Sequence, residues 1–290
     1  MNATPKISLI ICTRNRAASI HRCLDAILKI ESVNHFELIL VNNASTDHTA
    51  TLLQKFVDSC ALPVVVVNEP IPGLSRARNA GIAAASGDLM AFSDDDCYLA
   101  PDYLTALGSS FENKKVGFVG GRVLLFDPAD LPITIQTSEQ PAQFLPQQYM
   151  PPSGAIHGAN FAFRREVFNR IGLFDINLGA GTPCMGAEDT DLLQRALMAG
   201  FQGLYSPAPL VFHHHGRRTA DDEKTILRAY ALARGAYFLK GLINPLTRGL
   251  YVWPVLKRGG GHLAYCRYMD LFQELKGALF YWRQHRLNHI

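Results

Sequence analysis

The sequence predicts an α/β protein with a mostly parallel sheet that is flanked by helices and followed by a helical C-terminal segment. Over the first hundred residues, short apolar runs alternate with amphipathic stretches, which is the pattern of βαβ units. After Gly216 the pattern becomes helical, aromatic and basic. Right-handed crossovers bring the carboxyl ends of parallel strands to one edge of the sheet, where ligands bind in such folds.

Four strands and three helices are predicted in the first hundred residues. The apolar runs expected as strands are Ile7–Cys12, Phe36–Val41, Pro63–Asn68 and Leu89–Ser93. The stretches with helical spacing are Ser19–Ile30, Thr49–Ser59 and Leu74–Ala85. Three of the strands run directly into polar residues, at positions 13–16, 42–47 and 93–96. These polar strand ends are the first indication of a binding site.

The pattern is less regular in the middle of the chain. Asp127–Pro152 is rich in Pro and Gln and is predicted to be a long loop, of a length that is usually functional or mobile. A strand is expected at Ala159–Phe163, and helices at Arg165–Ile171 and Asp189–Gly200. The expected domains are residues 1–216, with halves 1–100 and 101–216, and a C-terminal segment of residues 217–290.

Composition narrows the class of protein. Apolar residues make up 48% of the chain and charged residues 18%, which is typical of a globular protein. The net charge of +3 is too small for a general nucleic-acid binder. Positive charge is concentrated in residues 217–290, which suggests that this segment meets anions.

Cysteine usage and the N-terminus point to the cytoplasm. The six cysteines are scattered without any CxxC spacing, so a zinc site is not expected and a reducing compartment is. The first apolar run is too short for a signal peptide. Uninterrupted apolar stretches of about 18 residues are absent from the sequence, so no transmembrane helix is expected.

The strongest chemical signal is the run Asp94-Asp95-Asp96 at the end of an apolar strand. Three adjacent carboxylates repel one another unless a cation is present. Oxygen ligands suit Mg²⁺ or Mn²⁺, and a diphosphate would complete the coordination shell. The alternative is a solvated acidic turn that caps the next helix, but the position after a buried strand favours a metal.

Eight segments of the chain resemble, in the same order, family 2 glycosyltransferases of the GT-A fold. They are IICTRNR, ELILVNNASTD, GLSRARNAG, SGDLMAFSDDDC, GANFAFRREVF, GLFD, GAEDTDLLQRA and PLVFHHHG. They cover roughly residues 7–216 and leave the C-terminal segment uncovered. The resemblance implies an inverting, metal-dependent transfer of a sugar from a nucleotide diphosphate, with a UDP-sugar favoured. Residues 1–100 would then be the nucleotide-sugar half and residues 101–216 the acceptor half.

The resemblance also implies where the donor binds. Asn43 falls where the family often has an aspartate that pairs with the base, and Asn42 likewise replaces a common aspartate. Because an amide both donates and accepts hydrogen bonds, the base stays open. The positions assigned to the donor, besides the acidic run, are Thr13, Arg14, Asn15, Asn43 and Arg78. Arg78 either faces the diphosphate or is an ordinary helix residue.

The metal ligands expected from the resemblance are Asp96 and His213. Asp94 and Asp95 would contact ribose and metal. Side chains alternate along a strand, so the first and third of the three histidines at 213–215 can share a face, whereas the second points away. A neutral imidazole is a good ligand for Mn²⁺.

Asp189 matches the carboxylate that deprotonates the acceptor hydroxyl in this family, with Glu188 and Asp191 as alternatives. An acid at a helix N-terminus is also explained by pairing with the helix dipole. The neighbouring Gly179–Gly186 segment resembles a flexible lid on the acceptor side. Arg195 either supports the site or pairs with Asp191 one turn earlier.

The basic and aromatic C-terminal segment suggests two roles. It either lies on an anionic membrane surface or packs on the catalytic domain or a second subunit. The first role would suit a lipid-linked acceptor, peripheral attachment at the inner face of the membrane and the synthesis of cell-envelope polysaccharide. A carbohydrate acceptor is equally consistent.

Other functions compete with the transferase. A nucleotidyltransferase would need a glycine-rich first loop, which TRNRAAS is not. A sugar-nucleotide-binding scaffold that has lost activity is compatible with Asn42 and Asn43. A membrane-adaptor protein would bind its membrane even without Asp96.

Overall fold

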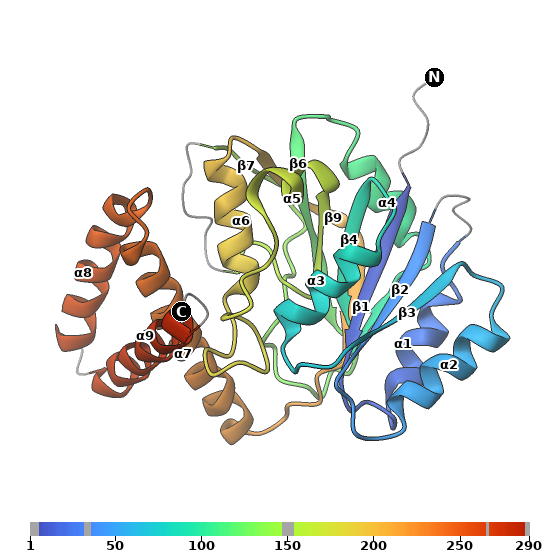
Figure 1. Cartoon of the computed structure of the whole chain (residues 1–290), viewed down its shortest axis with the longest axis horizontal. Helices are drawn as coiled ribbons and strands as arrows, with labels where there is room; N and C mark the ends of the chain where they lie inside the picture. Colours follow the sequence, from blue (N-terminus) through green and yellow to red (C-terminus); the bar gives the residue numbers. More distant parts are fainter. Residues whose placement is uncertain (1–5, 32–35, 147–153, 265–266, 288–290) are drawn as a thin grey trace. The chain divides into compact units, whose positions relative to one another are not determined.

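The computed structural model describes residues 6–31, 36–146, 154–264 and 267–287 (Figure 1). It divides into two compact units. The first consists of Met1–Pro72, Arg76–Leu173 and Leu192–Arg218. The second consists of Gly73–Ser75, Phe174–Asp191 and Thr219–Ile290.

Nine strands of the described residues form one sheet in the first unit. In chain order the strands are β1 (Ile7–Thr13), β2 (Phe36–Asn43), β3 (Val64–Glu69), β4 (Leu89–Asp94), β5 (Cys97–Leu99), β6 (Val116–Leu125), β7 (Ala142–Phe144), β8 (Asn160–Arg164) and β9 (Gln202–His213). Their spatial order is β3-β2-β1-β4-β8-β6-β9-β5, and β7 pairs with β9. The helices among them are α1 (Ile20–Ile27), α2 (Thr49–Ser59), α3 (Leu74–Ala84), α4 (Tyr103–Ser110), α5 (Arg165–Ile171) and α6 (Glu188–Met198).

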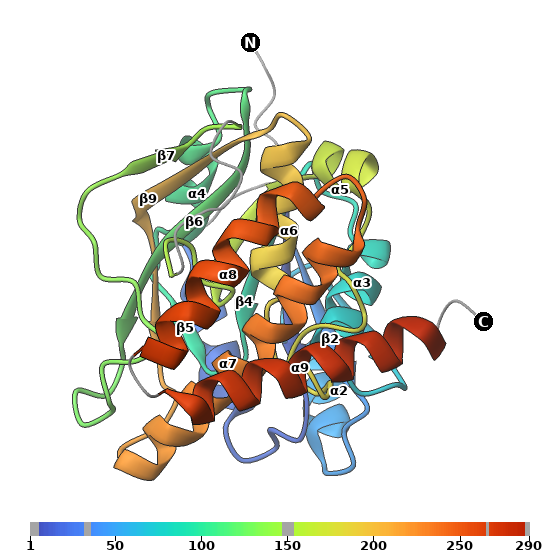
Figure 2. The same ribbon diagram turned by 90° about the vertical axis from the view of Figure 1, so that its left-hand side faces the viewer.

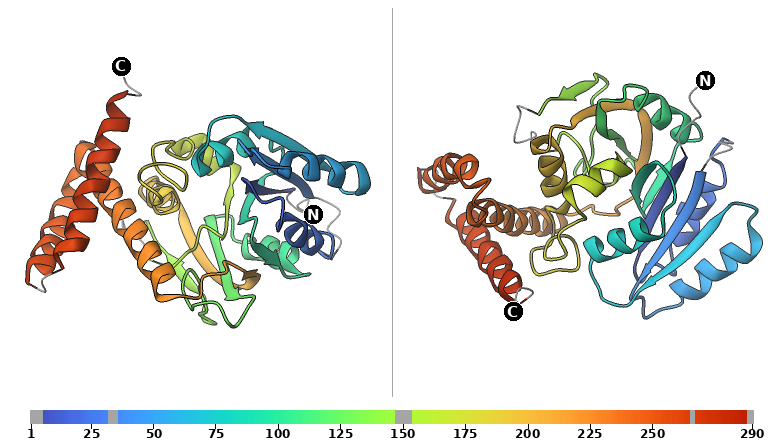
Figure 3. Two further views of the ribbon diagram at one scale, coloured as in Figure 1. Left: turned by 90° about the horizontal axis from the view of Figure 1, so that it is seen from below. Right: turned by 45° about the horizontal axis from the view of Figure 1, so that its top comes forward.

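The N-terminal half of the sheet is parallel, as predicted. β1 pairs in parallel with both β2 and β4, and β2 pairs in parallel with β3. The blue strands in Figure 3 are β1, β2 and β3. The register sets Thr13 opposite Asn42, and Cys12 opposite Asp94. The polar strand ends therefore meet at one edge. Beyond β4 the sheet is mixed, because β8 runs antiparallel to its neighbours β4 and β6.

The core of this unit lies on both faces of the parallel strands, which explains their unbroken apolar runs. The strands β1, β2 and β4 are buried along almost their whole length. The third apolar run behaves differently, since β3 is an edge strand on which Val65 is exposed. The four consecutive valines predict a strand buried on both faces, but the sequence does not show that β3 has a neighbouring strand on only one side.

The segment predicted as a long loop contains some regular structure. β7 (Ala142–Phe144) pairs with β9, and Gln136 forms an isolated bridge with Val123 of β6. Three residues are too few to produce a readable alternation in the sequence, so the strand was missed. The end of the predicted loop, residues 147–153, lies outside the described residues.

The second unit is built on α7 (Ala220–Ile243), α8 (Arg248–Ala264) and α9 (Tyr268–Leu287), the orange and red helices of Figure 2. α7 begins with a capping box, in which Thr219 and Asp222 each bond the backbone of the other. α7 and α9 cross closely at two glycines: a Cβ on Gly235 or Gly277 would lie 1.8–1.9 Å from a backbone oxygen of the partner helix. None of the helices formed by the described residues combines the length and hydropathy that crossing a bilayer requires.

Phe174–Asp191 belongs to this helical unit. Lys240 of α7 lies 2.7 Å from carboxylate oxygens of both Asp175 and Asp191, and Tyr281 of α9 donates to Asp175. The second unit therefore combines Phe174–Asp191 with the chain from Thr219 onward. The ion pairs that join these segments link residues far apart in the sequence.

Glu37, near the start of β2, joins β2 to the start of β1 and to the segment after α3. Its carboxylate accepts hydrogen bonds from Ser8 Oγ at 2.6 Å, from the backbone N–H of Ser86 at 2.6 Å and from Lys6 Nζ at 3.0 Å. Burial alone would raise the pKa of Glu37, but these donors outweigh it and lower the pKa from 4.5 to about 2.

We expect Glu37→Gln to lower the free energy of unfolding at pH 7 by about 1–3 kcal/mol, because a neutral amide cannot accept all these bonds. The folded-state pKa is depressed, so the stabilisation is complete above pH 4.5 and is lost as the pH falls toward 2. Urea titrations at several pH values measure this. The exposed Glu112→Gln is the control, and an equal effect of both variants would contradict the prediction.

Candidate active site

The loops after β1 and β2 hold each other at the edge of the sheet. Asn15 accepts a hydrogen bond from the backbone N–H of Thr46 at 2.7 Å, and its own N–H donates to Ser45 Oγ at 3.0 Å. Asp47 accepts from the N–H of Ala17 at 3.0 Å. Asn15 and Asp47 thus lock the two loops together. Of the other predicted donor residues here, Thr13 is buried and Arg14 is exposed.

The two asparagines at the end of β2 face neighbouring polar groups. Asn43 donates from Nδ2 to the carbonyl of Ile71 at 2.8 Å, which fixes it to the loop after β3. Asn42 donates from Nδ2 to Asn68 Oδ1 at 2.9 Å. Within the described residues, the buried Oδ1 of Asn42 has no hydrogen-bond partner. An unsatisfied buried acceptor at a strand end is a group that a ligand N–H can satisfy.

Arg16 neutralises the acidic run. Its Nε lies 3.0 Å from Asp95 Oδ1, and its Nη2 lies 3.0 Å from Asp96 Oδ2. Sequence reasoning did not single out Arg16. The signal was available, since β1 and β4 are adjacent parallel strands and Arg16 and the carboxylates follow their ends. Burial raises the pKa of Asp95 to about 6 even though Arg16 opposes the rise.

Arg78 of α3 is only 3% exposed. Its Nη2 donates to the carbonyl of Gly158 at 3.0 Å and lies 3.6 Å from Asp94 Oδ1, and its guanidinium covers the ring of Phe161. Arg78 is therefore not a solvated helix residue. Its anionic neighbour is Asp94 of the acidic run.

Asp96 and His213 meet because β5 pairs with β9. The register sets Cys97 opposite His213, and Asp96 Oδ1 lies 3.4 Å from His213 Nε2. On the other side of the ring, Nδ1 lies 3.1 Å from the carbonyl oxygen of Thr134. When Nδ1–H donates to that carbonyl, the lone pair of Nε2 faces Asp96, which is the arrangement of a metal-binding histidine.

These residues suit a divalent cation. Among the described residues, three side chains that could bind a metal ion lie together: Asp96, Cys97 and His213. Their possible ligand atoms are all within 4.8 Å of one another. An ion about 2.1 Å from two adjacent ligands holds them about 3.0 Å apart, so the observed pair needs little movement. Burial keeps the pKa of the Cys97 thiol well above its usual value, so the carboxylate and imidazole are the better ligands for Mn²⁺ or Mg²⁺.

Without an ion, the two groups stabilise each other's charged forms. Burial would lower the pKa of His213, but the hydrogen bond and the charge of Asp96 raise it. Burial would likewise raise the pKa of Asp96, and His213 lowers it. A metal ion would therefore displace a proton from the pair on binding.

The three histidines alternate as predicted. The rings of His213 and His215 lie 5.1 Å apart, whereas His214 Nδ1 lies 2.9 Å from the hydroxyl of Tyr98. His215 does not join the metal group. It is held by the carbonyl of Leu131, 3.1 Å from its Nε2.

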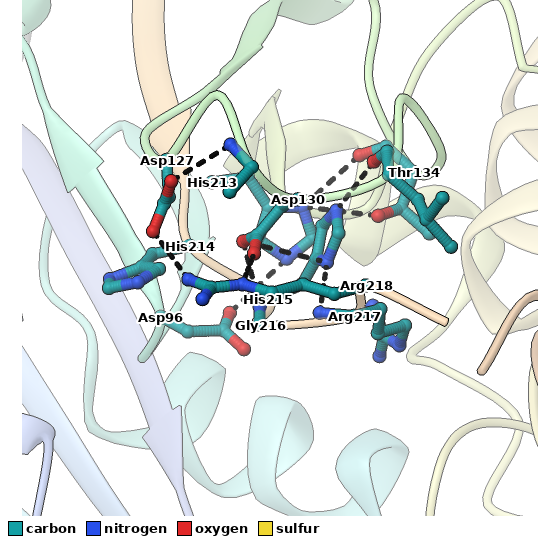
Figure 4. A network of polar contacts seen from close by, with 12 residues as sticks. Asp96, Asp127, Asp130, Thr134, His213, His214, His215, Gly216, Arg217 and Arg218 are labelled. Carbon is teal, nitrogen blue, oxygen red and sulfur yellow. Dashed lines mark hydrogen bonds and ion pairs between the residues drawn. The ribbon is translucent and has the colours of Figure 1, made fainter.

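A network around Asp130 supports the segment behind His213 (Figure 4). Asp130 accepts hydrogen bonds from the N–H of Gly216 at 2.9 Å and from Arg218 Nε at 3.0 Å, and His215 lies nearby at 3.8 Å. These contacts fix the chain after β6 against the chain after β9. They thereby place Thr134 against the metal-ligand candidate His213.

Arg217 is a second cation that sequence reasoning missed. Burial would raise the pKa of Asp96, but His213, then Arg16 and then the charge of Arg217 lower it. Within the described residues, its buried Nη1 has no hydrogen-bond partner. A buried guanidinium donor near a carboxylate that is a candidate metal ligand is suited to a phosphate oxygen.

The predicted base lies in the first turn of α6, which belongs to the second unit. Asp189 is half-buried, and its Oδ1 accepts from the N–H of Thr190 at 2.6 Å. Asp191 is buried against Lys240, and Glu188 is buried near Gly179. Of the three acids, Asp189 is the least buried, which favours it as the group that meets an acceptor.

Arg195 has a supporting role at the other end of α6. It donates to the carbonyls of Ile171 and Leu173 at 2.8 and 2.9 Å, which ties α6 to the end of α5.

Backbone strain is concentrated in the segments that carry these residues. The non-glycine residues with positive φ in the described parts are Asn15, Ala44, Thr134, Met185 and Ala187, with φ between 52° and 70°. They follow β1 and β2, face His213 and precede the first turn of α6. Such conformations are energetically costly and cluster at functional sites.

Comparison with known proteins decides the family. The model of glycosyl transferase family 2 matches residues 8–172, more than half of the chain. The chain belongs to glycosyl transferase family 2. The match spans β1 to α5 and therefore includes the acidic run but neither His213 nor the acids of α6.

Two of the curated relatives are named as glycosyltransferases. The chain is 27% identical over 228 residues to the probable glycosyltransferase YdaM of Bacillus subtilis, covering 73% of this chain and 51% of that protein. It is 31% identical over 120 residues to glycosyltransferase AglE of Haloferax volcanii, covering 41% and 40%. An uncharacterized protein of Sinorhizobium fredii, y4gI, is 25% identical, with 79% of this chain and 26% of that protein covered. The chain thus spans about half the length, or less, of these relatives.

Solved structures confirm the GT-A fold. The mannosyltransferase PcManGT of Pyrobaculum calidifontis, in complex with GDP-Man and Mn²⁺, matches with a TM-score of 0.65 and 20% identity, covering 96% of this chain and 74% of that one. S. aureus TarS 1-349 in complex with UDP-GlcNAc matches with a TM-score of 0.58 and 17% identity, covering 85% and 69%.

We expect Asp96→Asn to weaken metal-dependent donor binding by at least about tenfold, because a neutral amide is a poor ligand for Mn²⁺. Isothermal titration with a nucleotide-sugar, with Mn²⁺ or with EDTA, measures this. The control is Asp58→Asn on the exposed face of α2, which removes a carboxylate far from the strand ends. Unchanged affinity in Asp96→Asn would show that the metal lies elsewhere.

Proposed function

We propose that the chain is an inverting glycosyltransferase that moves a sugar from a nucleotide diphosphate donor onto an acceptor hydroxyl. Asp96 and His213 hold a divalent metal, Mn²⁺ or Mg²⁺, and Asp189 is the base. The observation that carries the proposal is the meeting of Asp96 and His213 at the edge where the strand ends gather. Membership of glycosyl transferase family 2 supports it.

The residues proposed to bind the donor lie at the same edge of the sheet. Thr13, Arg14, Asn15 and Asn43 lie at the ends of β1 and β2, where the nucleoside would bind. Asp94 and Asp95 face ribose and metal. A UDP-sugar is the favoured donor. The ligands bound in the two similar structures differ in base, GDP-Man in one and UDP-GlcNAc in the other, so only a screen of several bases resolves which one the amide of Asn43 accepts.

The metal, when bound, neutralises the charge that develops on the leaving diphosphate. Arg217 donates its unpartnered Nη1–H to a phosphate oxygen, and Arg16 shields the remaining carboxylate charge. Asp189 accepts the proton of the acceptor hydroxyl as that oxygen attacks the anomeric carbon. Attack from the side opposite the diphosphate inverts the configuration of that carbon.

We place this activity in the cytoplasm, at the inner face of the membrane, in the synthesis of cell-envelope polysaccharide. Cys12, Cys23, Cys60, Cys97 and Cys184 are free thiols, which suits a reducing compartment. The acceptor is a carbohydrate, either free or linked to a lipid.

A thermal-shift screen of UDP-, GDP- and dTDP-sugars, each with Mn²⁺, Mg²⁺ or EDTA, tests the donor. A ligand that binds only the folded state raises the melting temperature by mass action. We expect a metal-dependent shift with UDP-sugars that Asp96→Asn abolishes. A shift with another nucleotide alone would reassign the base, and no shift with any donor would favour a scaffold that has lost its donor.

We expect Asp189→Asn to retain donor binding and to lower turnover by about 10²–10⁴, the usual contribution of a positioned base. Donor hydrolysis or transfer to a mixture of candidate acceptors, followed by nucleotide release, measures turnover. Asp221→Asn, an exposed acid in the first turn of α7, is the control. Full turnover in Asp189→Asn together with loss in Glu188→Gln would move the base to Glu188.

A further inference from the structure

The helix α9 has one face that packs inside the second unit and one face that is exposed. One face packs on α7 through Glu274, Gly277 and Tyr281, which are all buried. At Gly277 the contact is so close that a Cβ would lie 1.9 Å from the carbonyl oxygen of Leu232. The orientation of α9 on α7 is therefore fixed, and the face opposite these residues must point away from α7.

That outward face is apolar. Its large side chains recur at helical spacing and are 41–62% exposed. They are Tyr268, Phe272, Leu275, Leu279 and Trp282. A helix that packs on one side of a protein normally has polar residues on the other, so this stripe needs a partner.

The neighbouring helix α8 has a similar outward face. Val252, Trp253 and Leu256 are 44–70% exposed there. Figure 2 shows α8 and α9 together in front of α7, and the left view of Figure 3 shows the three helices packed side by side. We call the eight residues named here, five on α9 and three on α8, the α8–α9 apolar face.

Positive charge borders the α8–α9 apolar face. Lys257, Lys276, Arg283 and Arg286 are exposed among its apolar residues, and the guanidinium of Arg286 lies over the ring of Trp282 at 4.6 Å. The acids of these two helices do not offset this charge. Glu274 is buried and binds Arg234 and Arg258, and Asp270 pairs with Arg267.

We propose that the α8–α9 apolar face binds the surface of a membrane that contains anionic phospholipids, with both helices lying in the plane of the interface. Apolar side chains would enter the acyl boundary while lysine and arginine reach the headgroup phosphates. Tryptophan and tyrosine are the residues that favour this depth. A second copy of the chain is a poor occupant, because two faces bordered by the same cations repel each other.

Membrane contact would give the enzyme access to an acceptor that is anchored in lipid. This consequence rests on the proposed function, whereas the binding surface itself does not. Cations near an anionic surface each strengthen binding by about fivefold, so several together with the apolar side chains suffice for reversible attachment.

The two tryptophans of the chain, Trp253 and Trp282, both lie on this face and serve as its reporters. We expect the full chain to co-sediment with vesicles of phosphatidylcholine with about 30% phosphatidylglycerol, and at least about tenfold more weakly with phosphatidylcholine alone. Tryptophan emission should shift to the blue on adding anionic vesicles. Trp253→Phe and Trp282→Phe then report the two helices separately.

Two pairs of substitutions separate the apolar and electrostatic contributions. Phe272→Gln with Leu275→Gln should lower vesicle affinity by at least about tenfold, and Arg283→Gln with Arg286→Gln should remove most of the preference for anionic lipid. The matched controls, expected to bind as the wild type does, are Leu28→Gln with Leu173→Gln and Lys55→Gln with Lys114→Gln.

Three outcomes would overturn the proposal: no co-sedimentation, equal binding of the control and face variants, or a dimer in solution that Phe272→Gln with Leu275→Gln converts to monomer. The last would assign the face to a second copy. The test is separable from the donor site, because the face variants should keep the donor-induced thermal shift and Asp96→Asn should keep vesicle binding. Loss of one property without the other identifies which proposal fails.

Discussion

The antiparallel pairing of β5 with β9 determines the geometry of the candidate site. It joins a three-residue strand that follows the acidic run to the end of a strand formed more than a hundred residues later, and so brings Asp96 to His213. Much of the surrounding structure maintains this meeting. Thr134 fixes the imidazole, the Asp130 network fixes Thr134, and the backbone N–H of His214 donates to the carbonyl of Asp96.

The candidate site contains three adjacent, largely buried carboxylates, whose mutual repulsion is unfavourable without positive charge nearby. Arginine side chains of the same unit supply part of that charge. Arg16 pairs with Asp95 and Asp96, Arg78 lies against Asp94, and burial nevertheless raises the pKa of Asp95 to about 6. A divalent ion would supply the remaining positive charge. The strained residues at the strand ends and beside His213 fit the same picture, in which local stability is given up to hold polar groups in place.

The second unit has an interior and an outward surface that differ in character. Its interior, where Lys240 holds Asp175 and Asp191, organises the segment that leads into the first turn of α6. Its outward face on α8 and α9 carries apolar and basic side chains that serve no internal packing. The interior and the outward face are related through the glycines at the α7–α9 crossing, because the close contact there fixes which side of α9 faces outward.

The parallel half of the sheet, the polar strand ends, the acidic run and the alternation of the histidines could be predicted from the sequence, because each follows from local periodicity or from adjacent residues. The donor positions, Asp189 and His213 came from the resemblance. The folded chain was needed to show that Arg16 and Arg217 act on the acidic run, that Arg78 is buried and that β7 exists. It also showed that Phe174–Asp191 packs with the C-terminal helices. These depend on pairings between distant segments, and hydrophobic periodicity carries no information about which distant partner a strand or a charged side chain will find.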